Sequence, residues 1–492
     1  MAEFFDTATE AVADIPDGVT IAAHIWRLSS TPAQLMFAIR DLGIKDLTII
    51  VPSFGKALNF PDEIPNPDIL LPQLKKVITN FVGRRSGSNT AEDFMGGRAE
   101  RGELELEING HGNWVLRLAA GASRLGGIYT PIGVGTELEE GAEVREIDGQ
   151  KYIFLTALRP DVGLVRAYKA DRLGNLVYRG TERGAASIVA QAAKLTIVEV
   201  EEIVEVGELD PEEIVTPHIF VDRIIKIPEG AVGSRSQKMA VIKKLVQQEN
   251  AGSIYFALPT GAKGGCAIGP AGKERLSTDV LAMRVAKELK AGDFVNLGIG
   301  IPQMVAGYVP PGVHFECENG CLGYGPLVSS NDLSQADYAR IDAGGRFFST
   351  APGMSFFDMV TSFNMVRRGR IISIVGALEV AENGDLANHS LGKADKYSQI
   401  GGAMDVAWGA KRVIVCMTHT TKNGRPRILK ECSLPVTARG KVSLIITDIA
   451  VMEVTPAGLV LKEVAPDWTA EEVQSLTEAR LIVADDLTDI TL

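Results

Sequence analysis

Short apolar runs that look like strands alternate with amphipathic runs that look like helices along most of the 492-residue chain. Residues 46–52 (DLTIIVP) and 411–417 (KRVIVCM) are apolar and rich in β-branched side chains, which is typical of strands buried in a parallel sheet. Residues 32–42 and 278–290 show the spacing of amphipathic helices. This alternation predicts an α/β fold in which helices cover mostly parallel sheets.

The two halves of the sequence resemble each other. Three stretches of the first half match three of the second in character and in order, namely 16–21 with 290–295, 165–175 with 375–385, and 195–205 with 443–453. The length also predicts more than one domain. We therefore predict two similar open α/β domains related by duplication, over residues 1–225 and 276–492. Residues 226–275 are rich in Gly, Pro and polar side chains and predict a linker with a short helix near 237–249.

Charge and composition exclude several classes of protein. The formal net charge of −12 argues against a nucleic-acid partner, which would need a basic surface. No run reaches the roughly 18 apolar residues of a membrane helix, so we expect no membrane partner. The N-terminus lacks a basic start and an apolar core, which predicts a cytoplasmic protein without a signal or transit peptide.

Five cysteines are too few, for this length, to indicate a disulfide scaffold. Cys317 and Cys321 have a C-x3-C spacing, but a metal site would need further ligands, and the nearest histidine is His314. We predict two small buried thiols and no metal.

Two glycine-containing turns follow predicted strands of the second half. Gly298 and Gly300 follow the strand 293–297, where glycines let the backbone approach a ligand and a helix start offers N–H donors. The same pair also fits an ordinary tight turn, and no third glycine completes a dinucleotide fingerprint. Gly376 and Ala377 end another apolar strand, and backbone N–H groups at such turns suit an oxyanion.

A carboxylate, Glu318, stands between these turns in the sequence. It follows an apolar stretch and precedes Asn319 and three glycines, Gly320, Gly323 and Gly325. A charged residue at a strand end among glycines is exposed to whatever occupies the cleft there. The alternative is a helix cap or a surface turn.

The order of these motifs carries a resemblance. Residues 298–302 (GIGIP), 318–326 (ENGCLGYGP) and 401–405 (GGAMD) resemble the β part of the family I CoA-transferases, and most of all the succinyl-CoA:3-oxoacid CoA-transferases. The first half resembles their α part in residues 129–136, 167–175 and 198–204. The resemblance implies α and β parts fused in one chain, three-layer domains, an active site at their interface, and a homodimer or homotetramer.

The resemblance also implies roles for particular residues. Glu318 would be the nucleophile of a ping-pong transfer through a mixed anhydride and a glutamyl-CoA thioester, with coenzyme A as substrate and no tightly bound cofactor. Gly298, Gly300, Gly376 and Ala377 are candidates for stabilising the oxyanion, and Asn319 either orients the carboxylate or caps its turn. The candidates for binding the CoA body are Gly376, Ala377, Lys393, Lys396 and Gly401, although the two lysines equally fit a solvated loop.

The first half departs from the family at its loops, which puts acetoacetate in doubt as the substrate. Residues 22–28 (AAHIWRL) replace a glycine-rich run, and other loops carry Phe54 and Arg84. We predict that Trp26, Arg27, Phe54 and Arg84 contribute to a different acid pocket, with Trp26 equally able to belong to the core. Two alternatives stay open: an acyl-CoA hydrolase on the same scaffold, and a non-enzymatic sensor of small acids.

Overall fold

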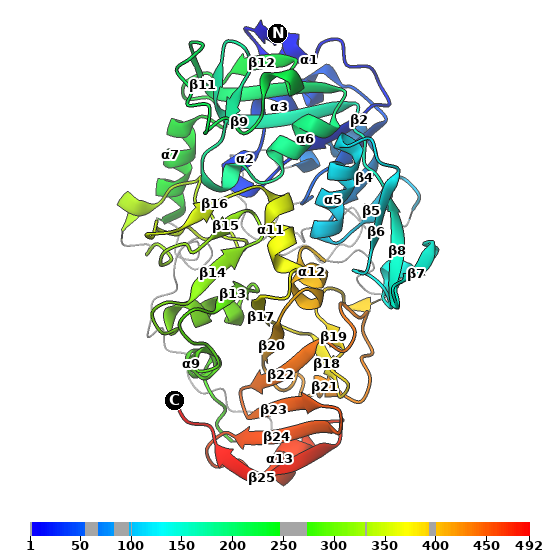
Figure 1. The fold of residues 1–492 in the computed structure, drawn as a ribbon, viewed down its shortest axis with the longest axis vertical. Helices are drawn as coiled ribbons and strands as arrows, with labels where there is room; N and C mark the ends of the chain where they lie inside the picture. The colour runs from blue at the N-terminus through cyan, green and yellow to red at the C-terminus, as the bar shows by residue number, and fades with distance from the viewer. Residues whose placement is uncertain are drawn as a thin grey trace.

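The protein is described here by a computed structural model that covers residues 2–54, 67–82, 98–99, 101–246, 273–329, 332–392 and 400–492. The first half of the chain occupies one end of the long axis and the second half the other, with the termini toward opposite ends (Figure 1). Each half is built on one large sheet.

The sheet of the first half is parallel along its main path. A short strand, β10 (Leu176–Val177), pairs antiparallel with β9 at its side. In sheet order the strands are β1 (Glu3–Phe5), β12 (Arg223–Lys226), β11 (Leu195–Val204), β9 (Val162–Asp171), β2 (Thr20–Ala23), β3 (Leu47–Ile50), β4 (Leu74–Thr79) and β5 (Glu105–Ile108).

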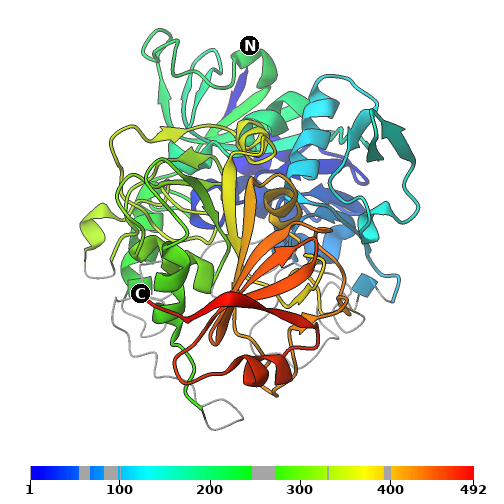
Figure 2. The same ribbon diagram turned by 60° about the horizontal axis from the view of Figure 1, so that its bottom comes forward.

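The sheet of the second half has a parallel centre, antiparallel pairs on both sides of it, and a last strand, β25, that pairs parallel with β24. In sheet order its strands are β16 (Ser355–Phe356), β15 (Cys321–Leu322), β14 (His314–Cys317), β13 (Phe294–Leu297), β17 (Ile371–Val375), β20 (Arg412–Met417), β22 (Val442–Thr447), β23 (Ala450–Thr455), β24 (Gly458–Val464) and β25 (Leu481–Asp489). The last strands and α13 (Ala470–Ser475) close the far end of the molecule (Figure 2).

Both sheets share the same central strand order. A central strand (β2 or β13) pairs on one side with the next strand in sequence (β3 or β14) and on the other with a later one (β9 or β17). Such a reversal of strand order opens a crevice at the carboxyl ends of the strands, where ligands of open α/β sheets bind. The α/β fold with mostly parallel sheets is thus confirmed, whereas the domain limits 1–225, 226–275 and 276–492 stay predictions.

One sequence match between the halves is wrong. The sequence pairs residues 195–205 with 443–453, yet β11 lies next to β9 as β20 lies next to β17, so 195–204 corresponds to 412–417. The physical reason is that buried parallel strands are all short runs of β-branched apolar residues, which look alike in sequence.

Helices pack on the sheets and between the halves. The helices expected over residues 32–42 and 278–290 are α3 (Ala33–Leu42) and α9 (Thr278–Ala286). The helix expected near 237–249 is α7 (Arg235–Val246). Ser277 begins α9, because its hydroxyl accepts a hydrogen bond from the Val280 N–H at 3.3 Å. Within the described part of the chain, no helix is long and apolar enough to cross a membrane. The helices are α1 (Ala8–Val12), α2 (Arg27–Ser30), α3 (Ala33–Leu42), α5 (His111–Ala122), α6 (Ala186–Ala192), α7 (Arg235–Val246), α9 (Thr278–Ala286), α10 (Ile301–Met304), α11 (Met359–Val366) and α12 (Ala403–Trp408).

Two small sheets and several short 3₁₀ turns complete the described structure. The small sheets have the orders β19 (Leu386–Ala387), β18 (Glu379–Ala381), β21 (Ile428–Leu429) and β6 (Gly127–Thr130), β8 (Gln150–Thr156), β7 (Val144–Ile147). The 3₁₀ turns are η1 (Pro67–Gln73), η2 (Glu137–Glu139), η3 (Gly180–Glu182), η4 (His218–Phe220), η5 (Val305–Gly307) and η6 (Leu333–Gln335).

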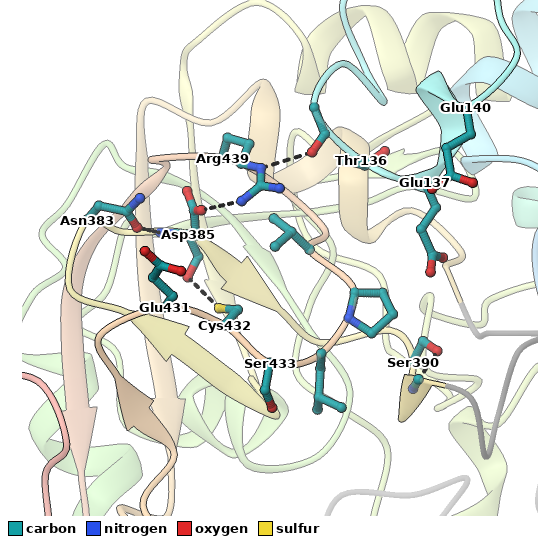
Figure 3. Close-up of a pocket in the computed structure, with 15 residues that line it drawn as sticks. Thr136, Glu137, Glu140, Asn383, Asp385, Ser390, Glu431, Cys432, Ser433 and Arg439 are labelled. Carbon is teal, nitrogen blue, oxygen red and sulfur yellow. Dashed lines mark hydrogen bonds and ion pairs between the residues drawn. The ribbon is translucent and has the colours of Figure 1, made fainter.

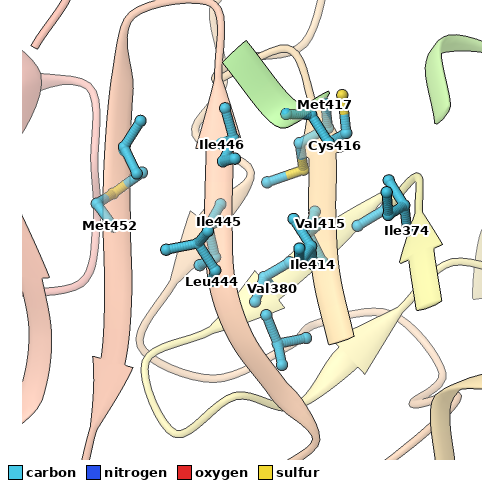
Figure 4. Close-up of a cluster of buried hydrophobic side chains, with 14 of the residues drawn as sticks. Ile374, Val380, Ile414, Val415, Cys416, Met417, Leu444, Ile445, Ile446 and Met452 are labelled. Carbon is cyan, nitrogen blue, oxygen red and sulfur yellow. The ribbon is translucent and has the colours of Figure 1, made fainter. Parts of the chain in front are cut away.

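The core of the second half lies on the central strands of its sheet. Ile374, Val415 and Ile445, from β17, β20 and β22, are buried side by side (Figure 4). Burying such a side chain contributes about 1.5–3 kcal/mol. These strands are therefore held rigidly, and so are the turns at their carboxyl ends.

Candidate active site

The two halves meet midway along the molecule, where α5 of the first half lies beside α11 and α12 of the second (Figure 1). The backbone of Gly401 joins both sides: its N–H donates to the Asn80 carbonyl at 2.9 Å and its carbonyl accepts from the His111 N–H at 2.8 Å. Met359 and Phe363 of α11 pack into the apolar cluster of the first half. The interface is thus continuous with a core.

A buried carboxylate forms hydrogen bonds across this interface. Asp405 in α12 is fully buried and accepts a hydrogen bond from the Gly112 N–H, at the start of α5, at 3.0 Å. Arg367 donates to the same carboxylate through Nε at 2.9 Å and Nη2 at 2.6 Å. The charge is thus neutralised and hydrogen-bonded, as a buried carboxylate requires.

Glu318 lies at this interface, directly after β14. Its turn needs glycine at 320, where φ is +110° and a Cβ would lie 2.1 Å from the Phe357 carbonyl oxygen. The Glu318 side chain is 13% exposed, and one carboxylate oxygen, Oε1, lies 3.4 Å from Nδ1 of His111. The carboxylate is therefore largely sheltered from water while one edge stays accessible.

Gly402 lies against the other oxygen of the same carboxylate. A Cβ added to Gly402 would lie 1.6 Å from Glu318 Oε2, although the backbone of Gly402 has φ −83° and ψ −2°, which any residue adopts. Glycine is required here by close approach and not by conformation. Its N–H has no hydrogen-bond partner among the described residues.

A second carboxylate, Glu316, lies two residues before Glu318 and is buried. Its oxygens accept hydrogen bonds from Asn296 Nδ2 and Ser362 Oγ, each at 2.7 Å. Burial, and to a lesser extent the charge of Glu318, raise the pKa of Glu316 to about 7, against the lowering effect of these two hydrogen bonds. Near neutral pH the Glu316 carboxyl is therefore only partly ionised.

This pair makes the stability of the protein depend on pH. The pKa of Glu316 is higher in the folded state than in the unfolded chain, so its contribution is full below about pH 4.5 and is lost as pH rises through about 7. Glu316→Gln removes the ionisation, and Gln can still accept from Asn296. At pH 8 we expect the free energy of unfolding of the variant to exceed that of the parent by on the order of 3 kcal/mol, so that the variant unfolds at a higher temperature.

The gain in the free energy of unfolding should disappear near pH 5, where the Glu316 carboxyl of the folded parent is already protonated. Glu288→Gln is the matched control, because ion pairs with Arg284 and Arg412 outweigh burial and lower the pKa of Glu288. That variant should be less stable than the parent at pH 8. Thermal unfolding followed by circular dichroism at both pH values measures the difference, and an equal effect of Glu316→Gln at both would contradict the assignment.

Aromatic rings enclose His111. Its ring stacks on Trp26 with centroids 6.0 Å apart and contacts Phe363 at 5.2 Å and Trp114 at 6.1 Å. His24, from the end of β2, is buried nearby. Burial, with a smaller effect of the neighbouring His111, lowers the pKa of His24 to about 3. Trp26 is a predicted pocket residue, and the structure places it beside the ring that faces Glu318.

The other predicted pocket residues lie elsewhere or outside the described residues. Phe54 is fully buried in the apolar cluster of the first half, where its backbone bridges to Val82. Arg84 lies outside the described residues, as do Lys393 and Lys396 and the side chain of Arg27.

The predicted oxyanion donors divide into two groups. The N–H of Gly298 donates to the Ile374 carbonyl at 2.8 Å, and that of Gly300 to Gln303 Oε1 at 3.3 Å, so both are already engaged. Gly376 and Ala377 have no N–H partner within the described ranges. Of the four candidates, Gly376 and Ala377 keep donors to offer.

Asn319 anchors its own turn. Its side-chain Nδ2 donates to the Ile341 carbonyl at 2.7 Å, and its Oδ1 accepts from the Cys317 thiol at 2.7 Å. These bonds favour the turn-holding interpretation. Cys317 and Cys321 are buried thiols in adjacent strands, as predicted, and burial raises the pKa of Cys317 well above its usual value.

A cleft of about 1090 Å³ lies to one side of this site, between the first half and the loops of the second (Figure 3). Arg439 crosses it, donating to the Gly135 carbonyl at 2.9 Å and pairing with Asp385 at 2.7 Å. Glu318 does not line the cleft. The segment at its rim nevertheless connects with the site, because Asn388 Nδ2 donates to the Gly376 carbonyl at 3.1 Å. The lining residues are Gly135, Thr136, Glu137, Glu140, Asn383, Asp385, Ser390, Gly392, Glu431, Cys432, Ser433, Leu434, Pro435, Val436 and Arg439.

Several site residues are not predicted from the sequence. His24 lies beside the predicted Trp26 in the stretch 22–28 that departs from the family, so the departure itself was a signal for His24. Gly402 and Asp405 belong to the run GGAMD, but no spacing shows which glycine touches Glu318. His111 and Asn80 gave no signal, because single polar residues in separate loops have no pattern.

The sequence and the fold both match known CoA transferases. The chain matches the family described as "Coenzyme A transferase" over residues 5–226 and 278–476. It is 33% identical to human "Succinyl-CoA:3-ketoacid coenzyme A transferase 2, mitochondrial", over 99% of this chain and 91% of that protein.

A second relative and a solved structure agree with this match. The chain is 33% identical to mouse "Succinyl-CoA:3-ketoacid coenzyme A transferase 2A, mitochondrial", over 98% of this chain and 90% of that protein. The fold matches a crystal structure of an acyl-CoA transferase of E. coli O157:H7 in a thioester complex with CoA, with a TM-score of 0.74, 19% identity, and coverage of 100% of this chain and 95% of that one. The chain therefore belongs to the coenzyme A transferase family.

Proposed function

We propose that Glu318 is the nucleophile by which this CoA transferase moves CoA from an acyl-CoA to a free carboxylic acid. The observation that carries the proposal is the position of the Glu318 carboxylate, held between His111 of the first half and the backbone of Gly402. A carboxylate is a weak nucleophile in water because it is well solvated, and burial at an interface removes much of that solvation.

The reaction proceeds by four acyl transfers. A Glu318 oxygen attacks the thioester carbonyl carbon, the C–S bond breaks, and CoA leaves as a thiolate from a mixed anhydride. The thiolate attacks the glutamyl carbonyl, which forms glutamyl-CoA and releases the first acid as a carboxylate. The second acid attacks this thioester, and the returning thiolate attacks the new acyl carbonyl and regenerates Glu318.

Each tetrahedral intermediate places negative charge on an oxygen near the attacked carbon. The backbone of Gly402 lies beside the carboxylate, and Gly376 and Ala377 directly follow β17 with N–H groups that have no partner among the described residues. One such donor contributes about 3 kcal/mol to transition-state stabilisation. CoA also has a long body, and the 1090 Å³ cleft joined to the Gly376 turn is our candidate site for part of it.

Trapping of the covalent intermediate tests the proposal. The enzyme is incubated with an acyl-CoA in the absence of acceptor, reduced with borohydride, digested and analysed by mass spectrometry. We expect a reduced residue at position 318, since borohydride converts a glutamyl thioester to an alcohol. An unmodified Glu318 with exchange still running would refute the nucleophile.

The same incubation separates transfer from hydrolysis. Adding a second acid should accelerate loss of the acyl-CoA and yield the new acyl-CoA, whereas a hydrolase would release free CoA at the same rate with or without it. The proposed partners are acyl-CoA and small acids, as in short-chain acid or ketone-body metabolism. A homodimer or homotetramer and a cytoplasmic location stay predictions.

A further inference from the structure

Four side chains at the carboxyl-end loops of the first half have buried polar atoms without a hydrogen-bond partner among the described residues. They are the ring nitrogens of His24, Nε1 of Trp26, both side-chain polar atoms of Asn80, and Nε2 of His111. We refer to these four residues as the polar wall. His24, Asn80 and His111 are at most 2% exposed.

One member of the polar wall, His111, lies against the Glu318 carboxylate, whereas Nε2 of His24 lies against the backbone of Gly184, where an added Cβ would be 2.1 Å away. His111 lies 3.4 Å from Glu318, Trp26 stacks on His111, and His24 is close enough for charge on His111 to affect it. The backbone of Asn80 holds Gly401, the neighbour of the glycine that touches Glu318. The residues come from the carboxyl ends of β2 and β4 and from the start of α5, which is the crevice side of the sheet.

Unpaired buried polar groups are costly, at about 1–3 kcal/mol each. Native proteins pair the great majority of them, so several together indicate a missing partner. Within the described residues, these side-chain atoms make no hydrogen bond that would stabilise the fold. The hydrogen-bonding groups of the polar wall are therefore available to a molecule that enters beside Glu318.

The kinds of unpaired group limit what that molecule is. His24 is neutral and offers one donor and one acceptor, and the Asn80 amide offers both as well. Nε2 of His111 is a further unpaired ring nitrogen, while Trp26 offers a donor. An alkyl group would satisfy none of these, a ketone would satisfy only donors, and a carboxylate would place negative charge against acceptors. A hydroxyl group both donates and accepts.

We propose that the polar wall binds the hydroxyl group of the carboxylic acid, so that this enzyme selects hydroxy acids over their unsubstituted and oxo counterparts. The inference rests on the proposed reaction at Glu318. It concerns residues in loops of the first half and not the nucleophile itself.

A comparison of acceptor acids with the full-length enzyme tests the inference. The acids are butyrate, 2-hydroxybutyrate, 3-hydroxybutyrate, acetoacetate and succinate, each assayed for kcat/KM with one acyl-CoA donor. We expect at least one hydroxybutyrate to exceed both butyrate and acetoacetate by about 10-fold or more, because a site built to bind a hydroxyl rejects analogues that lack it. Equal values, or the highest value for butyrate, acetoacetate or succinate, would overturn the inference.

Variants connect any preference to the polar wall. His24→Leu and Asn80→Ala should each lower the ratio of kcat/KM for the hydroxy acid over butyrate by about 10-fold. His24→Leu should also keep or raise the unfolding temperature, because it removes an unpaired buried polar group. His218→Leu, at an exposed histidine of the same half, is the control and should leave the ratio unchanged.

A lower unfolding temperature in His24→Leu with an unchanged ratio would show a structural role and overturn the assignment. Failure of the underlying reaction has a different signature. No acid would then be a substrate, and borohydride would trap nothing at position 318 with any acyl-CoA.

Discussion

Replacing Glu318 by glutamine is expected to abolish CoA exchange, with a fall of at least about 10⁴-fold in kcat. The amide has nearly the shape of the carboxylate but cannot attack a thioester or carry CoA. The fold should be kept, because Glu318 lies at a partly exposed turn whose position depends on Gly320 and Asn319. Exchange is measured by chromatography of the acyl-CoA products, and folding by circular dichroism.

The thermal stability of Glu318→Gln gives an internal control. The charge of Glu318 is one of the causes that raise the pKa of Glu316, so removing it should not lower the unfolding temperature at pH 8. A variant that exchanges CoA at more than about 1% of the parent rate would contradict the nucleophile assignment. An inactive but unfolded variant would instead show that Glu318 is needed for structure.

Replacing Gly402 by alanine is expected to lower the rate of CoA exchange by about 10²–10³-fold, although the added methyl group takes no part in the chemistry. The added methyl would lie 1.6 Å from Glu318 Oε2, so the carboxylate must move to a new position. The backbone at Gly402 suits alanine, with φ −83° and ψ −2°, so conformational strain does not contribute. Steady-state exchange and borohydride trapping should fall together.

Two further variants locate the clash. Gly307→Ala is the control, because a Cβ there meets nothing within 4 Å, Glu318 included. The double variant Gly402→Ala with Glu318→Ala should recover the stability that Gly402→Ala loses through overpacking, without recovering exchange. If the effects of the two substitutions on the free energy of unfolding simply added, the methyl group and the carboxylate would not be in contact.

Much of the fold was predictable because buried parallel strands and amphipathic helices have short-range patterns. The strands expected over 46–52 and 411–417 are β3 and β20, and the helices expected over 32–42 and 278–290 are α3 and α9. The match of 195–205 with 443–453 was wrong, since strand identity depends on sheet neighbours and not on composition.

The site was predictable on one side only. Glu318 and its glycines are contiguous in sequence, and their spacing is readable, whereas His111 reaches Glu318 from 207 residues away. Gly298 and Gly300 look like oxyanion donors in sequence, but their N–H groups are bonded within the fold. Phe54 looks like a pocket residue, but it packs in the core.

The sequence by itself determined the α/β class, the paired halves and the family, and it singled out Glu318 as the candidate carboxylate, because each depends on a periodicity or a contiguous motif. Only the tertiary structure decided which glycine touches Glu318, that Glu316 is buried, that His111 lies 3.4 Å from Glu318, and that His24, Asn80 and His111 have buried polar atoms without a partner among the described residues. These facts depend on the packing of two halves against each other, and contacts between residues hundreds of positions apart leave no local pattern in a single chain.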